Sequence, residues 1–111
     1  MAGTHVADLQ SLISRMAPKM GDGVRLECKR FFSGAAAYAD GRIFMTLTPA
    51  GLALKLPEHG RATLMAAGGR PLRYFPNAPV KKEYVLCPSE LGDEALAHWI
   101  ALSVTFVQRK P

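Results

Sequence analysis

The chain begins with apolar residues at three- and four-residue spacing, which is the period of an amphipathic helix. These positions are Val6, Leu9, Ile13 and Met16. Thr4 lies just before them and suits the N-cap position, because its hydroxyl accepts a hydrogen bond from a free backbone amide. Pro18 and a Gly-Asp-Gly break at 21–23 follow the last apolar position. The pattern therefore predicts a short helix over residues 6–16 that ends before Pro18.

The period then changes to two. Residues 24–28 alternate apolar and charged side chains, which is typical of a half-buried strand. Phe31 and Phe32 break this alternation, because adjacent side chains of a regular strand point to opposite faces. A β-bulge, or a sharp bend at Gly34, resolves the conflict. We therefore expect one irregular strand that continues to a turn at Asp40-Gly41.

Asp40-Gly41 is a hairpin signal, since a two-residue type I′ turn needs positive φ at both central positions. A second strand is expected over 43–48, and Pro49-Ala50-Gly51 makes the next turn. Leucine then alternates with alanine and lysine over 52–56. The sequence therefore predicts a three-stranded antiparallel meander.

The second half of the chain returns to helix and strand. Pro57 suits the first turn of a helix, and Gly68-Gly69 suits its end. Strands are expected at 72–75 and 82–87, the latter with Tyr84 and Leu86 on one face and Val85 and Cys87 on the other. A last helix is expected over 93–107.

The last helix is apolar on more than one side. Its main stripe is Leu96, Trp99, Ile100, Ser103, Val104 and Val107. Leu102 and Phe106 lie off this stripe. A helix that is apolar on nearly all sides is either deeply covered or covers a partner, and 111 residues leave little chain to cover a second face. We therefore expect Trp99, Leu102 and Phe106 to form the interface of a homodimer.

These elements predict the fold class α+β, with a two-layer architecture and the order α-β(3)-α-β(2)-α. One antiparallel five-stranded sheet with helices packed on one side buries the apolar faces. A length of 111 residues and a composition with 49% hydrophobic and 21% charged residues indicate a single globular domain over 1–111. The longest uncharged stretch, residues 95–108, is shorter than the about 20 residues of a membrane span.

The charge is unevenly distributed. The chain carries a net charge of +5. All five charged residues from 61 to 82 are basic, namely Arg61, Arg70, Arg73, Lys81 and Lys82. Together with Tyr74, they form a candidate nucleic-acid surface, because phosphates attract cations and bases stack on aromatic rings. Alternatives are a solvated loop and pairing with the acidic segment 83–94 of a second copy.

No motif predicts catalysis. His5, His59 and His98 have no metal-ligand spacing, and neither Cys28 nor Cys87 has a Cys-x-x-Cys partner. Both cysteines are expected on the core face, although the cations beside Cys28 leave redox sensing as an alternative. A ligand pocket under the meander is a further alternative. We expect a protein without catalytic, metal or cofactor sites, without a secretory signal and located in the reducing cytoplasm.

An ordered set of segments resembles the N-terminal domain of the TfoX/Sxy family of bacterial competence regulators. The set is 31–34 (FFSG), 38–44 (YADGRIF), 52–56 (LALKL), Arg61, 69–74 (GRPLRY), 84–88 (YVLCP) and Trp99. The first segment departs from the family's usual form, with Phe31 for methionine and Ser33 for glycine. The resemblance implies a fold like that of the type III secretion chaperones.

The resemblance also implies a function. It implies a stand-alone regulatory domain, without the helical C-terminal domain of the full-length regulators and without catalytic residues. The sequence thus favours a non-enzymatic module that acts through protein contacts, as a homodimer or with a protein partner. The alternative is a nucleic-acid-binding regulator that uses the basic surface from Arg61 to Lys82.

Overall fold

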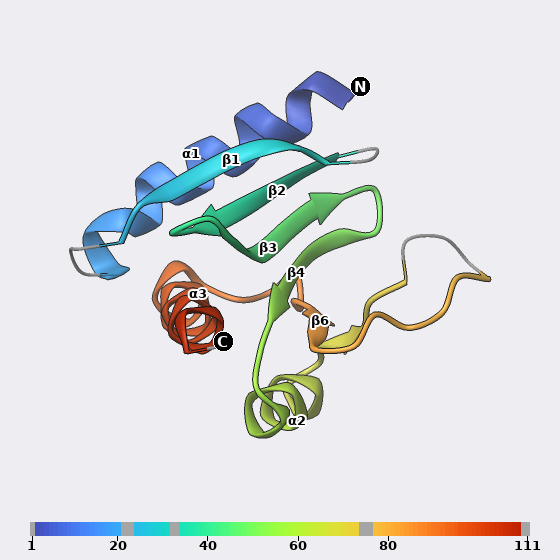
Figure 1. The fold of residues 1–111 in the computed structure, drawn as a ribbon. Coiled ribbons are helices and arrows are strands. Elements are labelled where there is room, and N and C mark those ends of the chain that lie inside the picture. Colours follow the sequence, from blue (N-terminus) through green and yellow to red (C-terminus); the bar gives the residue numbers. More distant parts are fainter. Residues whose placement is uncertain (1, 21–23, 32–33, 74–76, 110–111) are drawn as a thin grey trace.

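A computed structural model describes residues 2–20, 24–31, 34–73 and 77–109 of the chain. Its helices are α1 (Ala2–Met20), α2 (Glu58–Ala66) and α3 (Asp93–Gln108). Its strands are β1 (Leu26–Phe31), β2 (Gly34–Ala39), β3 (Arg42–Thr48), β4 (Gly51–Lys55), β5 (Arg70–Pro71) and β6 (Tyr84–Leu86). The strands form one antiparallel sheet in the order β1-β2-β3-β4-β6-β5 (Figure 1). The predicted α+β class is confirmed.

The sheet has six strands rather than the predicted five. The single irregular strand expected before Asp40 is a hairpin, because the chain reverses between Phe31 and Gly34, which pair with each other. Of the two alternatives predicted here, a bulge and a sharp bend at Gly34, the bend agrees better with the pairing of Phe31 and Gly34. The observed order is α-β(4)-α-β(2)-α.

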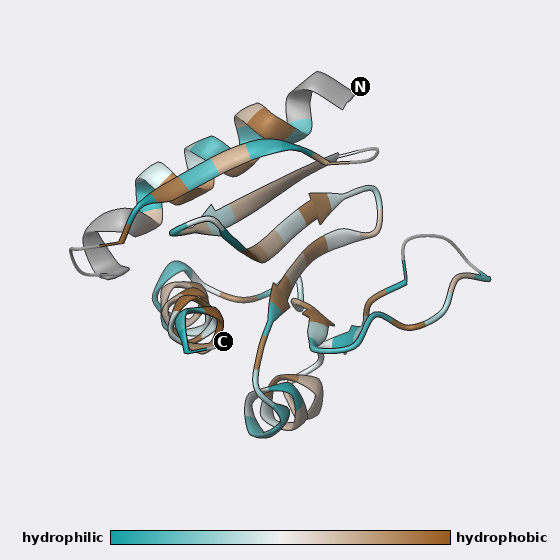
Figure 2. Ribbon diagram, viewed as in Figure 1, coloured by the Kyte–Doolittle hydropathy of each residue, from teal (hydrophilic) through white to brown (hydrophobic). Residues whose placement is uncertain are grey.

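The first helix is longer than predicted. It begins at Ala2, so Thr4 lies inside it and is not its N-cap. It also continues past Pro18 to Met20. Proline removes the amide that would donate to the Ser14 carbonyl, and Ser14 is exposed, so water can take the place of that donor. Figure 2 shows α1 alternating between hydrophilic and hydrophobic segments, as an amphipathic helix should.

The predicted turns are confirmed. Asp40 and Gly41 both adopt positive φ, at 50° and 83°, between β2 and β3. The Asp40 carboxylate accepts hydrogen bonds from the Arg25 amide and from Gln108 at the end of α3. The Arg25 amide is the main reason that the pKa of Asp40 lies below its ordinary value. The second helix ends as expected, with Gly68 at φ 112°.

Short strands at the far edge differ from the expected ones. The strand predicted over 72–75 is β5 at Arg70–Pro71, and residues 74–76 lie outside the described part of the chain. The strand predicted over 82–87 is β6, and its faces are as predicted. Val85 packs in the main core together with Cys87, whereas Tyr84 and Leu86 pack on the other face.

The main core lies between the sheet and the buried sides of the helices. Its fully buried large side chains include Phe44, Met45, Leu54, Leu64 and Ile100. A smaller cluster of Ala53, Leu72 and Tyr84 lies on the opposite face. Within the described residues, no helix is both long enough and apolar enough to span a bilayer.

One buried hydroxyl fixes α3 on the sheet. The Ser103 Oγ lies 3.0 Å from the Phe44 carbonyl oxygen and 2.6 Å from the Lys55 carbonyl oxygen. The Arg15–Asp93 ion pair, at 3.1 Å, and the Arg42 hydrogen bond to the Val107 carbonyl, at 2.9 Å, hold the two ends of the helix. These contacts define which face of α3 points away from the sheet.

Candidate functional site

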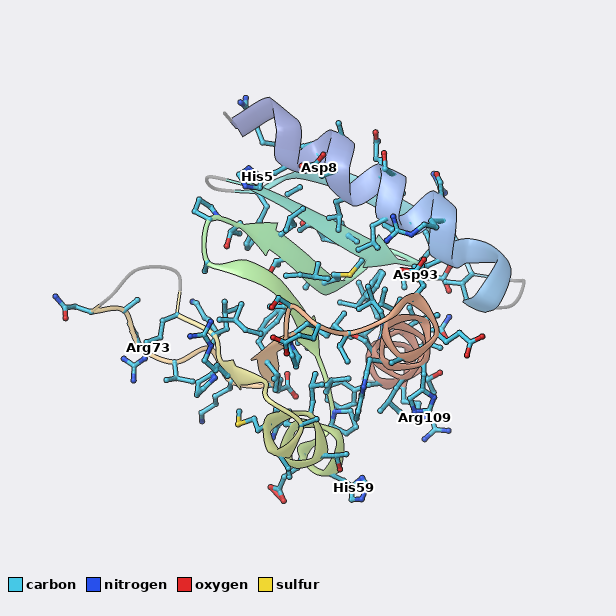
Figure 3. The ribbon with its side chains drawn as sticks, turned by 180° about the vertical axis from the view of Figure 1, so that it is seen from behind. His5, Asp8, His59, Arg73, Asp93 and Arg109 are labelled. Atoms are coloured by element: carbon cyan, nitrogen blue, oxygen red, sulfur yellow. The ribbon has the colours of Figure 1, made fainter. Side chains whose placement is uncertain are left out.

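The structure places four of the six residues of the candidate nucleic-acid surface on β5 and on the connection from β5 to β6. We call Arg70, Arg73, Lys81 and Lys82 the basic loop, and all four are exposed. The two arms of the loop are held together by a hydrogen bond from the Lys81 amide to the Leu72 carbonyl, at 2.9 Å. The loop extends away from the body of the domain (Figure 1), and Arg73 lies on it (Figure 3).

The sequence of the basic loop itself contains no acid. The chain has no Asp or Glu from 61 to 82. The next acid, Glu83, lies 3.8 Å from the Lys55 ammonium, and both side chains are largely buried. Arg73 donates one hydrogen bond to the Ala78 carbonyl, at 3.0 Å, and this bond supports the loop while the side chain stays exposed. The arrangement is a cationic projection that suits an anionic partner.

Arg61, another residue of that candidate surface, does not join the loop. Arg61 is half-buried on α2, where its guanidinium donates to the Leu56 carbonyl at 2.6 Å. It therefore stabilises the connection between β4 and α2. Tyr74, the last residue of that candidate surface, lies outside the described residues.

The three residues predicted for a dimer interface lie on one face of α3. Their spacing of three and four residues places Trp99, Leu102 and Phe106 side by side, and each is half-buried. We call them the α3 outer face. Leu102 points toward α2, since a Cβ atom added at Gly60 would lie 3.2 Å from the Leu102 Cδ2 atom. Part of this face is thus covered within the chain. The homodimer interface stays a prediction.

The histidines are far apart. His5 on α1 and His59 on α2 lie at opposite ends of the molecule (Figure 3). The exposed His98 packs its ring edge-on against Trp99, with a centroid distance of 5.6 Å. Within the described residues, no three His, Cys, Asp or Glu side chains come together as a metal site would require.

Both cysteines lie on the core face of the sheet, as predicted. Burial raises the pKa of the Cys28 thiol above its ordinary value and raises that of Cys87 to about 12. Redox-sensing thiols require the opposite shift, because the thiolate is the reactive form. Cys87 also borders a cavity of about 510 Å³ beside β4 and β6, whose charged lining residues are Arg70 and Glu90.

A comparison with models of known protein families shows which family the chain belongs to. The family model described as the TfoX N-terminal domain matches residues 20–107. The chain belongs to the TfoX N-terminal domain family. The match includes all six strands, α2 and nearly all of α3. A sequence search of curated proteins finds no match to this TfoX N-terminal domain.

One feature of this TfoX N-terminal domain escaped prediction. Strand β1 forms a free edge of the sheet, and Glu27 and Lys29 flank Cys28 on it. Whether a strand lies at the edge of the sheet depends on the order of the strands. The sequence pattern predicted β1 and β2 as one strand, so it could not place β1 at the edge. The available signal was the charged alternation of 25–29, which is unusual for a strand in the middle of a sheet.

Proposed function

We propose that this protein is a non-enzymatic regulatory domain that acts in the cytoplasm by binding another protein through the α3 outer face. Membership in the TfoX N-terminal domain family supports a regulatory role. The observation that carries the proposal is the position of Trp99 and Phe106. Both are half-buried aromatic residues that flank the buried stripe of α3, pack against the main core with one part and leave the other part exposed. Aromatic residues at such positions are typical centres of protein interfaces.

The sequence predicts two partners for this face, a second copy of the chain or a different protein. Gly60 of α2 already lies close to Leu102, whereas Trp99 and Phe106 each keep part of their surface exposed. Sedimentation across micromolar concentrations tests the self-association. A chain that remains monomeric over this range would remove the homodimer and leave a different protein as the partner.

Capture from the native host tests the interaction itself. We expect a protein retained by the immobilised wild-type chain to be retained at least about tenfold less by Phe106→Ser, because the aromatic side chain forms the centre of the contact. Thr105→Ala is the matched control, since Thr105 is exposed on the same helix. The folding of each variant is checked from its melting temperature. Equal retention by all three chains would contradict the proposal.

A second candidate function is the binding of nucleic acid by the basic loop. It is favoured by one observation, namely that four exposed cations share one projecting loop without an acid among them. Lys and Arg side chains that neutralise phosphates release counterions, and the affinity therefore falls steeply with salt.

Neutralising two loop cations tests this second candidate. We expect Arg73→Gln with Lys81→Gln to reduce the slope of log affinity against log salt by about 1.8 for duplex DNA, since each phosphate contact contributes about 0.9. Arg109→Gln is the matched control, because Arg109 is an exposed cation that lies on the opposite side of the molecule from Arg73 (Figure 3). Fluorescence anisotropy of labelled duplex DNA at several salt concentrations gives the slope for the double variant and for the control. An unchanged slope in the double variant would exclude the basic loop as the binding surface.

A further inference from the structure

The two edges of the sheet are built differently. Edge strand β5 has two residues, and one of them is Pro71, which has no amide to donate. Edge strand β1 has six residues without proline, and it pairs with β2 in unbroken register from Leu26 to Phe31. Short strands and proline are common means of blocking edge-to-edge pairing, and β1 has neither.

The hydrogen bonds identify the outward-pointing backbone groups of β1. The Asp40 amide donates to the Arg25 carbonyl at 2.8 Å, so Arg25 and Asp40 form a hydrogen-bonded pair. Hydrogen-bonded and non-hydrogen-bonded pairs alternate along an antiparallel ladder. The backbone groups of Leu26, Cys28 and Arg30 therefore point away from β2. These three residues are spaced symmetrically about Cys28.

The charged side chains of Glu27 and Lys29 are also placed symmetrically about Cys28, like the outward-pointing backbone groups. Glu27 and Lys29 lie on either side of Cys28, and both point to the face of the sheet opposite the helices, where Lys29 lies over the Tyr38 ring at 5.2 Å from its centroid. Glu27 has a weak contact of 3.9 Å with the highly exposed Arg25 on the same strand. Opposite charges that face each other across two strands stabilise their pairing, and like charges destabilise it.

We propose that a second copy of this chain docks along β1, so that the two β1 strands pair antiparallel about a two-fold axis at Cys28. This register places Cys28 opposite Cys28 and Glu27 opposite Lys29 of the second copy. It uses all three outward-pointing residues of each strand. A shift by two residues would use only two of them and would place Glu27 opposite Glu27, or Lys29 opposite Lys29. The backbone pattern and the charge pattern thus select the same register.

The resulting dimer is a continuous sheet with α1 of both copies on the same face, because the two-fold axis is perpendicular to the sheet. This arrangement assigns self-association to β1 and leaves the α3 outer face to a different protein. The two interfaces are separate, and an experiment can therefore distinguish them.

A charge exchange tests the register. We expect the wild-type chain to sediment as a dimer and Lys29→Glu to raise the dimer dissociation constant at least about tenfold, since two attractive pairs become repulsive. Glu27→Lys combined with Lys29→Glu restores opposite charges across the strands and should restore the dimer. Melting temperatures confirm that each variant is folded. A monomeric wild type, or a dimer that Lys29→Glu leaves unchanged, would overturn the proposal.

Cross-linking and fluorescence locate the interface. In a hydrogen-bonded antiparallel pair the Cα atoms are about 5.5 Å apart, which suits a disulfide. At alkaline pH an added oxidant such as diamide should accept two electrons from two Cys28 thiolates and link the chains, in Cys87→Ser but not in Cys28→Ser. Trp99 is the only tryptophan and should keep its emission maximum as the dimer forms. An emission shift that accompanies dimerisation, without Cys28 cross-links, would place the second copy on α3.

Discussion

Gly34→Ala is expected to lower the free energy of unfolding by about 3 kcal/mol, the upper end of the usual cost of overpacking a core. A Cβ atom at this position would overlap the Leu47 carbonyl oxygen and lie 2.8 Å from the Thr48 Cα atom. Both are backbone atoms of β3, near the middle of the sheet, and neither can move without displacing the strand. Gly34 also pairs with Phe31 where the β1–β2 hairpin reverses.

Thermal unfolding followed by circular dichroism measures this effect. For a domain of this size about 3 kcal/mol corresponds to a fall of about 15 °C in Tm. Gly92→Ala is the matched control, because Gly92 has φ −74° and an added Cβ atom there would meet no atom within 4 Å. The control should change stability by less than about 1 kcal/mol. A Gly34→Ala chain that melts together with the control would contradict the close approach of β2 and β3.

Removing two buried hydroxyls is expected to change stability in opposite directions. Ser103→Ala should cost about 2 kcal/mol, because it removes the single hydroxyl proton that the buried Phe44 carbonyl and the partly buried Lys55 carbonyl share. Thr46 is also fully buried, but its hydroxyl has no hydrogen-bond partner among the described residues. Thr46→Val keeps the shape and removes an unsatisfied polar group, so it should stabilise the fold by about 1 kcal/mol.

Urea unfolding of both variants measures the two changes. The slope of the free energy of unfolding against urea concentration should be the same in each variant as in the wild-type chain, which shows that the unfolded state is unaltered. A Ser103→Ala variant as stable as the wild-type chain would contradict the role of this hydroxyl in holding α3 on the sheet, and a destabilised Thr46→Val variant would contradict the prediction for Thr46. The comparison bears on function, because Ser103 determines which side of α3 presents Trp99 and Phe106.

Local signals predicted the parts of the fold that depend on neighbouring residues. Asp40-Gly41 formed the expected turn because its backbone needs positive φ at both positions, and few other residue pairs allow this. The apolar spacing of α3 gave its limits and its buried side. Because successive side chains of a strand point to opposite faces, the sequence also predicted which residues of β6 lie on each face of the sheet. The same signals failed at Thr4 and Pro18, because α1 begins before the one and continues past the other.

Interaction surfaces depended on contacts between distant parts of the chain. The charge run from Arg61 to Lys82 was visible in the sequence, but only the fold separated Arg61, which binds the Leu56 carbonyl, from the exposed basic loop. The exposure of Leu102 depended on Gly60 in another helix. No local pattern contains this information.

The sequence by itself determined the α+β class, the family and most helix and turn positions, because these follow from side-chain periodicity and backbone preferences within a few residues. The tertiary structure alone decided that 24–39 forms two strands and that β1 is a free edge. Strand order is set by which residues distant in sequence pair and bury each other. The self-complementary charges around Cys28 acquire a meaning only after that order is known.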